Sequence, residues 1–151
     1  MLKPKVTVIQ SFLWELFPIY VHIGLTVESA GGGLYSCRIP LTDRNKNHIG
    51  TVHACIQWAA AEVLGGLVVL ANFDHSRLFF VVREVAVQFL KPARTDLIAQ
   101  ASLSDARVEE LQHQLLRNGE VGFELDAAVR DRHGIVVAET TAQYLIRKKR
   151  G

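Results

Sequence analysis

The alternation of apolar and polar positions divides the first third of the chain into a helix and two strands. Apolar residues recur at helical spacing over about residues 6–17, between Pro4 and Pro18, which predicts a short amphipathic helix. Beyond Pro18 the period changes to two and predicts strands over residues 21–27 and 35–41. The glycines of "SAGGG" between them are typical of a hairpin turn, because glycine adopts positive φ without steric cost.

A second feature is the nearly apolar run from His53 to Ala71, which is long enough for a helix of five turns. Beyond His53 its only polar side chains are Gln57 and Glu62. A helix that is apolar on almost every side is normally enclosed by protein. Burying an ionised carboxylate costs several kcal/mol unless the charge is paired, so Glu62 requires a physical explanation.

The remainder of the chain alternates again. Four further runs predict strands over residues 81–90, 97–103, 121–129 and 136–146. Between the second and third of these, "DARVEELQHQLLRNG" predicts a helix with Asp105 as its N-cap and Asn118-Gly119 as its end.

The resulting order is helix, two strands, long helix, two strands, short helix, two strands. Half-polar strands joined by hairpins indicate an antiparallel sheet with one solvated face. The long apolar helix must cover the other face, so we expect an α+β fold in which a curled six-stranded sheet wraps around it. We expect one domain over residues 1–151. A single layer of sheet leaves strand edges open, and pairing with a second copy would cover them, which predicts a homodimer or a dimer of dimers.

Composition narrows the class of protein. The chain is 49% hydrophobic and 21% charged, which is typical of a folded domain. Polar residues and glycines interrupt the longest apolar run, and the N-terminus lacks a signal-peptide pattern, so we expect no membrane span and a cytoplasmic protein. A net charge of +2 is too small to indicate nucleic acid. The six scattered histidines and the absence of a phosphate-binding glycine loop predict neither a metal site nor a cofactor.

The segment before the long helix carries a pattern that resembles a known family. Asn47, Gly50 and His53 match N-x-x-G-x-x-H, the start of the N-x-x-G-x-x-H-G-G pattern of hotdog-fold thioesterases of the phenylacetic-acid-degradation type. Ala54 and Cys55 stand where this family commonly has two glycines.

Later segments extend the resemblance. Glu62 stands where the family has its helical acid, and "VAVQFLKPARTDLIAQASL" and "ETTAQYLIRK" resemble later strands of the fold. The resemblance covers about residues 20–147 and is closest to a bacterial branch whose helix begins N-H-x-G-T. It implies the hotdog fold.

The resemblance also implies an activity, the hydrolysis of a thioester of coenzyme A or of an acyl carrier protein. Glu62 would act as general base or nucleophile, and the backbone N–H of Ala54 would face the developing oxyanion. Asn47 would hold the substrate carbonyl or orient water toward the partner subunit's acid, with His53 beside the oxyanion amide. The residues alone leave other roles open: a structural acid for Glu62, a turn residue for Asn47, and loop bracing for His53.

The candidates for substrate binding are Gly50, Cys55, Trp58, Phe80, Lys91 and Arg94. Trp58 and Phe80 are expected near an acyl group, and Lys91 and Arg94 near phosphates. Core packing and solvated charge are the alternatives for these residues. Cys55 is not expected to act as a nucleophile with the neighbouring His53, since adjacent turns of one helix do not give that geometry.

Two other functions remain open. Hotdog dehydratases pair a histidine with a glutamate about fourteen residues later, and His48 and Glu62 have that separation, although the Pro-rich approach of those enzymes is absent. The chain would alternatively bind acyl thioesters, or simply dimerise, without turnover. Ala54-Cys55 in place of two glycines, and the lack of a Ser or Thr on the strand after the helix, favour this second alternative.

Overall fold

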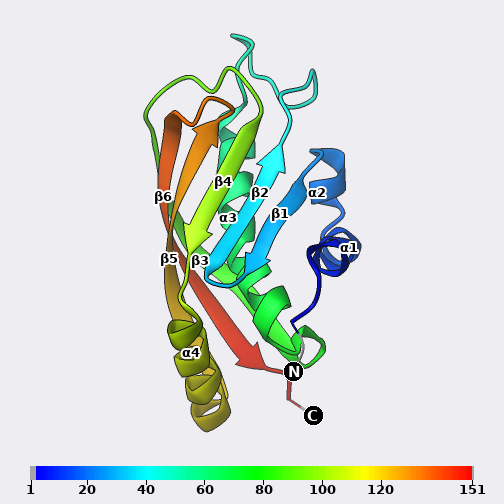
Figure 1. Cartoon of the computed structure of the whole chain (residues 1–151), viewed down its shortest axis with the longest axis vertical. Helices are drawn as coiled ribbons and strands as arrows, with labels where there is room; N and C mark the ends of the chain where they lie inside the picture. The colour runs from blue at the N-terminus through cyan, green and yellow to red at the C-terminus, as the bar shows by residue number, and fades with distance from the viewer. Residues whose placement is uncertain (1–2, 151) are drawn as a thin grey trace.

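A computed structural model describes residues 3–150, and in it a six-stranded antiparallel sheet curls around one long helix (Figure 1). The strands are β1 (Thr26–Gly31), β2 (Leu34–Ile39), β3 (Leu78–Phe89), β4 (Leu97–Ser102), β5 (Glu120–Asp131) and β6 (Val136–Lys148). Their order in the sheet is β1-β2-β4-β5-β6-β3. The predicted curled sheet and its antiparallel pairing are therefore confirmed.

The long helix, α3 (Ala54–Asn72), is the core of the molecule. Its length and mean hydropathy of 1.7 would also suit a membrane span, but 67% of that apolar window is buried inside the fold. The position of α3 within the sheet accounts for its composition. A 3-10 turn, η1 (His75–Arg77), joins α3 to β3.

Two short helices precede the sheet, α1 (Val6–Leu16) and α2 (Ile19–His22). The strand predicted over residues 21–27 is wrong over residues 21–25, because residues 19–22 are helical and β1 begins at Thr26. The apolar and polar residues here alternate as they would in a strand. However, Pro18 lies in the helical region as the N-cap of α2, and Gly24 turns the chain at φ +72°.

The remaining helix, α4 (Asp105–Asn118), packs at one end of the sheet against β5 (Figure 1). Its N-cap is Ser104, whose hydroxyl accepts the Arg107 N–H, so the prediction of Asp105 as N-cap is wrong by one residue. Asp105 instead begins the helix and pairs with Lys3 at 2.7 Å. The predicted end is confirmed, since Gly119 adopts φ +76° at the C-cap.

One close approach fixes how α3 lies against the sheet. Gly65 of α3 faces the ring of Tyr144 on β6, and a Cβ at Gly65 would lie 2.2 Å from the ring. At the neighbouring Gly66, the nearest atom to a Cβ would be 3.8 Å away, in Phe80. Only Gly65 is therefore required by packing.

We expect Gly65→Ala to destabilise the fold by about 1–3 kcal/mol, because the ring of Tyr144 must move to admit a methyl group. The matched control is Gly66→Ala, which meets no clash and should stabilise the helix by about 0.5–1 kcal/mol. Urea unfolding of both variants measures the difference. Equal effects would show that Tyr144 does not fix the position of the helix.

Candidate functional site

Glu62 lies in the middle of α3 and is partnered by two neutral phenols. Its Oε2 accepts a hydrogen bond from the hydroxyl of Tyr20 on α2 at 2.5 Å. Tyr144 donates to the backbone carbonyl of Glu62 at 2.8 Å. Among residues 3–150, Glu62 takes part in no ion pair. A structural salt bridge within the described chain therefore does not explain the acid.

An apolar cavity of about 330 Å³ surrounds the carboxylate. Its walls come from α1 and its end, from α3 and from the sheet, and include Leu13, Phe17, Val63, Phe80, Val82 and Tyr144. The rings of Phe17 and Phe80 meet edge to face at 5.9 Å and close one side. Glu62 Oε1 accepts no hydrogen bond from the described residues, and it is not among the side-chain atoms sealed inside the fold. One carboxylate oxygen is thus held, and the other is open to the cavity.

The environment changes the acidity of this group. Burial raises the pKa of Glu62 above its ordinary value, and the hydrogen bond from Tyr20 opposes this by stabilising the carboxylate. Burial also raises the pKa values of Tyr20 and Tyr144, and the Glu62 charge adds to both shifts. Both phenols consequently remain protonated donors across the physiological range.

The loop before α3 is held by Asn47. Its Oδ1 accepts the backbone N–H groups of Ile49 and Thr51, and its Nδ2 donates to the Thr51 hydroxyl at 2.8 Å. Gly50 turns this loop at φ +80°. Asn47 therefore serves as a loop-bracing residue within the chain, and one of its two amide hydrogens remains without a partner among the described residues.

His53 caps the helix and leaves one amide free. Its Nδ1 accepts the N–H of Cys55 at 3.0 Å, and its carbonyl accepts the N–H groups of Ile56 and Gln57. The N–H of Ala54 donates no hydrogen bond within residues 3–150. The first turn of a helix carries such unpaired donors and a partial positive charge, which favours a developing anion.

Ala54 and Asn47 line a second hollow of about 350 Å³, together with Phe89, Leu90 and Lys91 from the end of β3 and the loop after it. The predicted site residues thus form two groups: Glu62 with Phe80, and Asn47 with Ala54 and Lys91.

The other candidates for substrate binding lie outside both groups. Trp58 follows Ala54 by one turn, and Cys55 and Arg94 are exposed; none of the three lines either hollow. Glu62 and Ala54 are eight residues apart, about 12 Å along the helix axis. Within one subunit the acid and the free amide are too far apart to act on one carbonyl group.

Sequence reasoning missed two residues that build the site. Tyr20 lies between the predicted helix over residues 6–17 and the predicted strand over residues 21–27, and nothing in the local pattern signals a contact with Glu62. Asn45 is 2% exposed, donates to the carbonyls of Ile23 and Pro40, and accepts the N–H of His53 through its own carbonyl. Its position among the polar residues of a loop gave no indication of burial.

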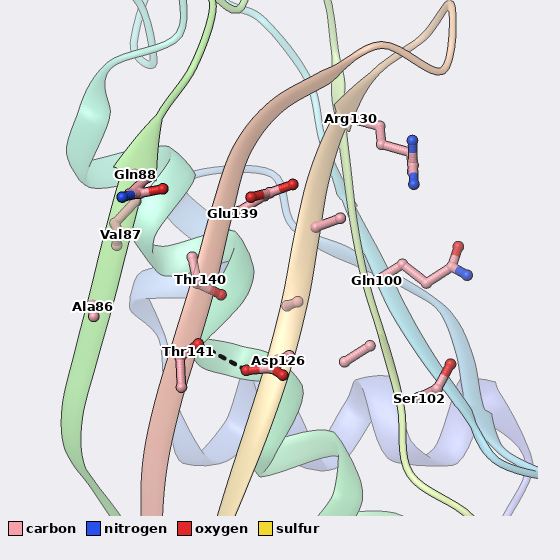
Figure 2. Close-up of a pocket in the computed structure, with 13 residues that line it drawn as sticks. Ala86, Val87, Gln88, Gln100, Ser102, Asp126, Arg130, Glu139, Thr140 and Thr141 are labelled. Carbon is pink, nitrogen blue, oxygen red and sulfur yellow. Dashed lines mark hydrogen bonds between the residues drawn. The ribbon is translucent and has the colours of Figure 1, made fainter.

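A larger hollow of about 810 Å³ lies on the outer face of the sheet (Figure 2). Figure 2 shows Gln88, Glu139 and Asp126 on three neighbouring strands, with Asp126 accepting a hydrogen bond from Thr141 at 2.7 Å. It contains none of the predicted catalytic residues. Within the described residues, no group of three His, Cys, Asp or Glu side chains is placed to bind a metal ion.

Comparison with known proteins identifies the family. Residues 7–146 match the model of a domain of unknown function, DUF4442. The chain belongs to this family.

Solved structures confirm the fold. The crystal structure of Pseudomonas aeruginosa PA5026, described as a protein of unknown function and "Probable Thioesterase", aligns with a TM-score of 0.86 and 28% identity over 98% of this chain and 99% of that one. The Haemophilus influenzae thioesterase HI1161 aligns with a TM-score of 0.76 and 14% identity over 98% and 96% of the two chains. The DUF4442 chain therefore has the predicted hotdog fold.

A further relative is a Halobacterium salinarum protein named "Putative esterase VNG_1336C". It is 35% identical over 85 residues, which are 54% of this chain and 56% of that protein. The match thus spans little more than half the length of this curated relative.

We expect Glu62→Gln to raise the free energy of unfolding at pH 7. The raised pKa means that Glu62 binds a proton more tightly in the folded state than in the unfolded chain. The fold therefore loses stability as the pH rises from the ordinary pKa of glutamate through the pKa of Glu62 in the folded state. Glutamine keeps an oxygen that accepts from Tyr20 and removes the charge. The gain should disappear below the ordinary pKa of glutamate. Urea unfolding between pH 4 and pH 8 tests this, and a loss of about 3–5 kcal/mol would identify Glu62 as a structural ion partner.

Proposed function

We propose that this DUF4442 protein is a thioesterase that hydrolyses acyl thioesters of coenzyme A or of an acyl carrier protein at a site shared by two subunits. The observation that carries the proposal is the Glu62 carboxylate, held at one oxygen and open to an apolar cavity at the other. A half-buried carboxylate with a raised pKa is suited to act as a general base near neutral pH. The thioesterase names of PA5026 and HI1161 support the same class of reaction.

The edges of the sheet favour one mode of dimerisation. The β1 edge is occupied by α1, where Gln10 accepts the N–H of Val27 and Trp14 donates to the carbonyl of Leu25. The β3 edge pairs only with β6 on its inner side, within the described residues. An open edge strand of twelve residues is a natural site for pairing with another chain.

The side chains along this edge are suited to such pairing. Phe79, Val81 and Phe89 are between 51% and 59% exposed. The centre of the strand carries Arg83 beside Glu84, and an antiparallel two-fold pairing centred there would set opposite charges across from each other. We infer a homodimer in which two β3 strands pair. The dimer of dimers stays a prediction.

This pairing would bring the two half-sites together. In an antiparallel pair, the beginning of one strand lies beside the end of the other. The beginning of β3, with Phe80 and Val82, lines the Glu62 cavity, and its end, with Phe89, lines the Ala54 hollow. The Glu62 cavity of one subunit would therefore adjoin the Ala54 amide of its partner.

The proposed reaction needs no further group. Glu62 Oε1 takes a proton from a water molecule while the water oxygen forms a bond to the thioester carbon. The carbonyl oxygen becomes an oxyanion, which accepts a hydrogen bond from the free N–H of Ala54 in the partner. When the carbonyl re-forms, the C–S bond breaks, and the thiol leaves with the proton from Glu62.

The surrounding residues suggest how the substrate would bind. The apolar cavity is suited to the acyl group, and Phe80 would contact it as predicted. Asn47 retains one amide hydrogen that would hold the thioester carbonyl or the water. Lys91, beside the Ala54 hollow, would meet a phosphate of the carrier.

We expect Ala54→Pro to reduce turnover by about 10²–10³-fold, because proline removes the proposed oxyanion donor. The fold should tolerate it, since proline suits the first position of a helix and His53 already has the extended conformation required before proline. The matched control is Ala54→Gly, which keeps the N–H and should keep turnover. Thiol release from a series of acyl-CoA substrates is the measurement.

The same substrate series separates the alternatives. Thiol release that is lost in Glu62→Gln supports the hydrolase, and normal hydrolysis by Glu62→Gln would refute the assigned role. Hydration of an enoyl thioester would instead indicate the lyase, with His48 and Glu62. Saturable binding without any product would indicate a binding module.

We expect Val81→Lys to convert the dimer into a folded monomer, because the pairing centred on Arg83 and Glu84 would set each lysine opposite an apolar residue, Ala86, on the partner strand, and a charge on a paired edge opposes pairing. Light scattering should then give 16.8 kDa in place of twice that mass, and turnover should fall with dimer content. Thr26→Lys on the β1 edge, an exposed position, is the control and should leave the mass unchanged. A wild-type protein that is monomeric at micromolar concentration would exclude the shared site.

A further inference from the structure

We propose that Tyr20 is the positioning residue of Glu62: its hydroxyl fixes one carboxylate oxygen so that the other faces the cavity as an ionised base. The proposal deepens the function proposed above and rests on it for its kinetic consequences. Tyr20 belongs to the N-terminal segment, 42 residues before Glu62 in the chain, and the two side chains meet only through tertiary packing.

Contacts hold both the backbone and the side chain of Tyr20 in place. The residue is 7% exposed, and its hydroxyl lies 2.5 Å from Glu62 Oε2. Its backbone carbonyl accepts the N–H of Leu25 at 2.9 Å, where the chain enters β1. Phe17 packs edge to face against its ring at 5.8 Å. A side chain held in this way constrains the carboxylate rather than following it.

The other elements around Glu62 offer no substitute for this contact. Tyr144 of β6 donates to the backbone carbonyl of Glu62, not to the carboxylate. Cys37 of β2 donates to the carbonyl of Ala60, and burial raises the pKa of its thiol to about 12. The neighbouring cavity walls of α1 and β3 are apolar, with Leu13 and Phe80. Among residues 3–150, Tyr20 is thus the only hydrogen-bond donor to the carboxylate, and no charged side chain pairs with it.

This arrangement gives Tyr20 two effects on the base. It holds Oε2 and leaves Oε1 as the oxygen that is open to the cavity, so it sets the direction of attack. It also opposes the effect of burial, since donation to the carboxylate lowers the pKa of Glu62 while burial raises it. Removal of the hydroxyl leaves burial unopposed, and the pKa of Glu62 rises.

The test is Tyr20→Phe, which removes the hydroxyl and keeps the ring. In the pH profile of kcat/KM for thiol release, the acid limb should move to higher pH by about one unit, the size expected for loss of a hydrogen bond to a charged group. At a pH on the acid limb of the wild-type profile, kcat/KM should therefore fall about tenfold, with a smaller loss at pH 9 and little change in KM. Tyr35→Phe removes another buried hydroxyl, which accepts from Asn72 at the C-terminal end of α3, and should leave the acid limb in place.

A direct titration separates failure of this proposal from failure of the proposed function. Carboxyl signals of carbon-13-labelled glutamate, with Glu62 assigned by its loss in Glu62→Gln, report the pKa of Glu62 without any substrate. A higher pKa in Tyr20→Phe than in the wild type supports the positioning role even if no thioester is hydrolysed. An unchanged or lower pKa of Glu62 in the folded variant overturns it, whatever the activity.

Discussion

The hydrogen bond between Tyr20 and Glu62 reconciles a carboxylate with the long apolar helix around which the sheet curls. An unpaired charge at this depth would destabilise the fold by several kcal/mol or remain protonated. A neutral phenol offers partial compensation: it stabilises the anion at Oε2 and leaves Oε1 open to the cavity. The N-terminal helices bring this phenol to the carboxylate and form part of the wall of the apolar cavity around it.

A second constraint is the length of α3. Eight residues, about 12 Å along the axis, separate the acid from the free amide at the start of the helix, so the proposed site requires one of these groups from each of two subunits. The same helix is flanked by the two ends of β3, the strand whose edge is open. The opposite edge is closed by Gln10 and Trp14. In the proposed function, one open edge next to both groups of candidate residues would link dimerisation to catalysis.

The sequence was sufficient to predict the sheet and the core helix, because period-two alternation and a continuous apolar run report burial directly. The candidate site residues came from the family resemblance, and their roles stay a prediction. The sequence did not predict α2, where alternating residues mimic a strand and only Pro18 marks a helix start. It could not predict the partnership of Tyr20 with Glu62, since a contact across 42 residues depends on tertiary packing that no local pattern encodes. Within the described chain Asn47 braces its loop, whereas His53 caps the helix, a role that the sequence did not suggest.

The central claim is that each active site combines Glu62 of one subunit with Ala54 of the other, and complementation tests it most directly. Glu62→Gln and Ala54→Pro subunits carrying different tags are co-expressed, and mixed dimers are purified through both tags. Each mixed dimer has one site with both groups intact, so we expect about half the wild-type turnover per dimer from two inactive parents. Mixed dimers as inactive as their parents would contradict the shared site, because both groups would then have to act within one subunit.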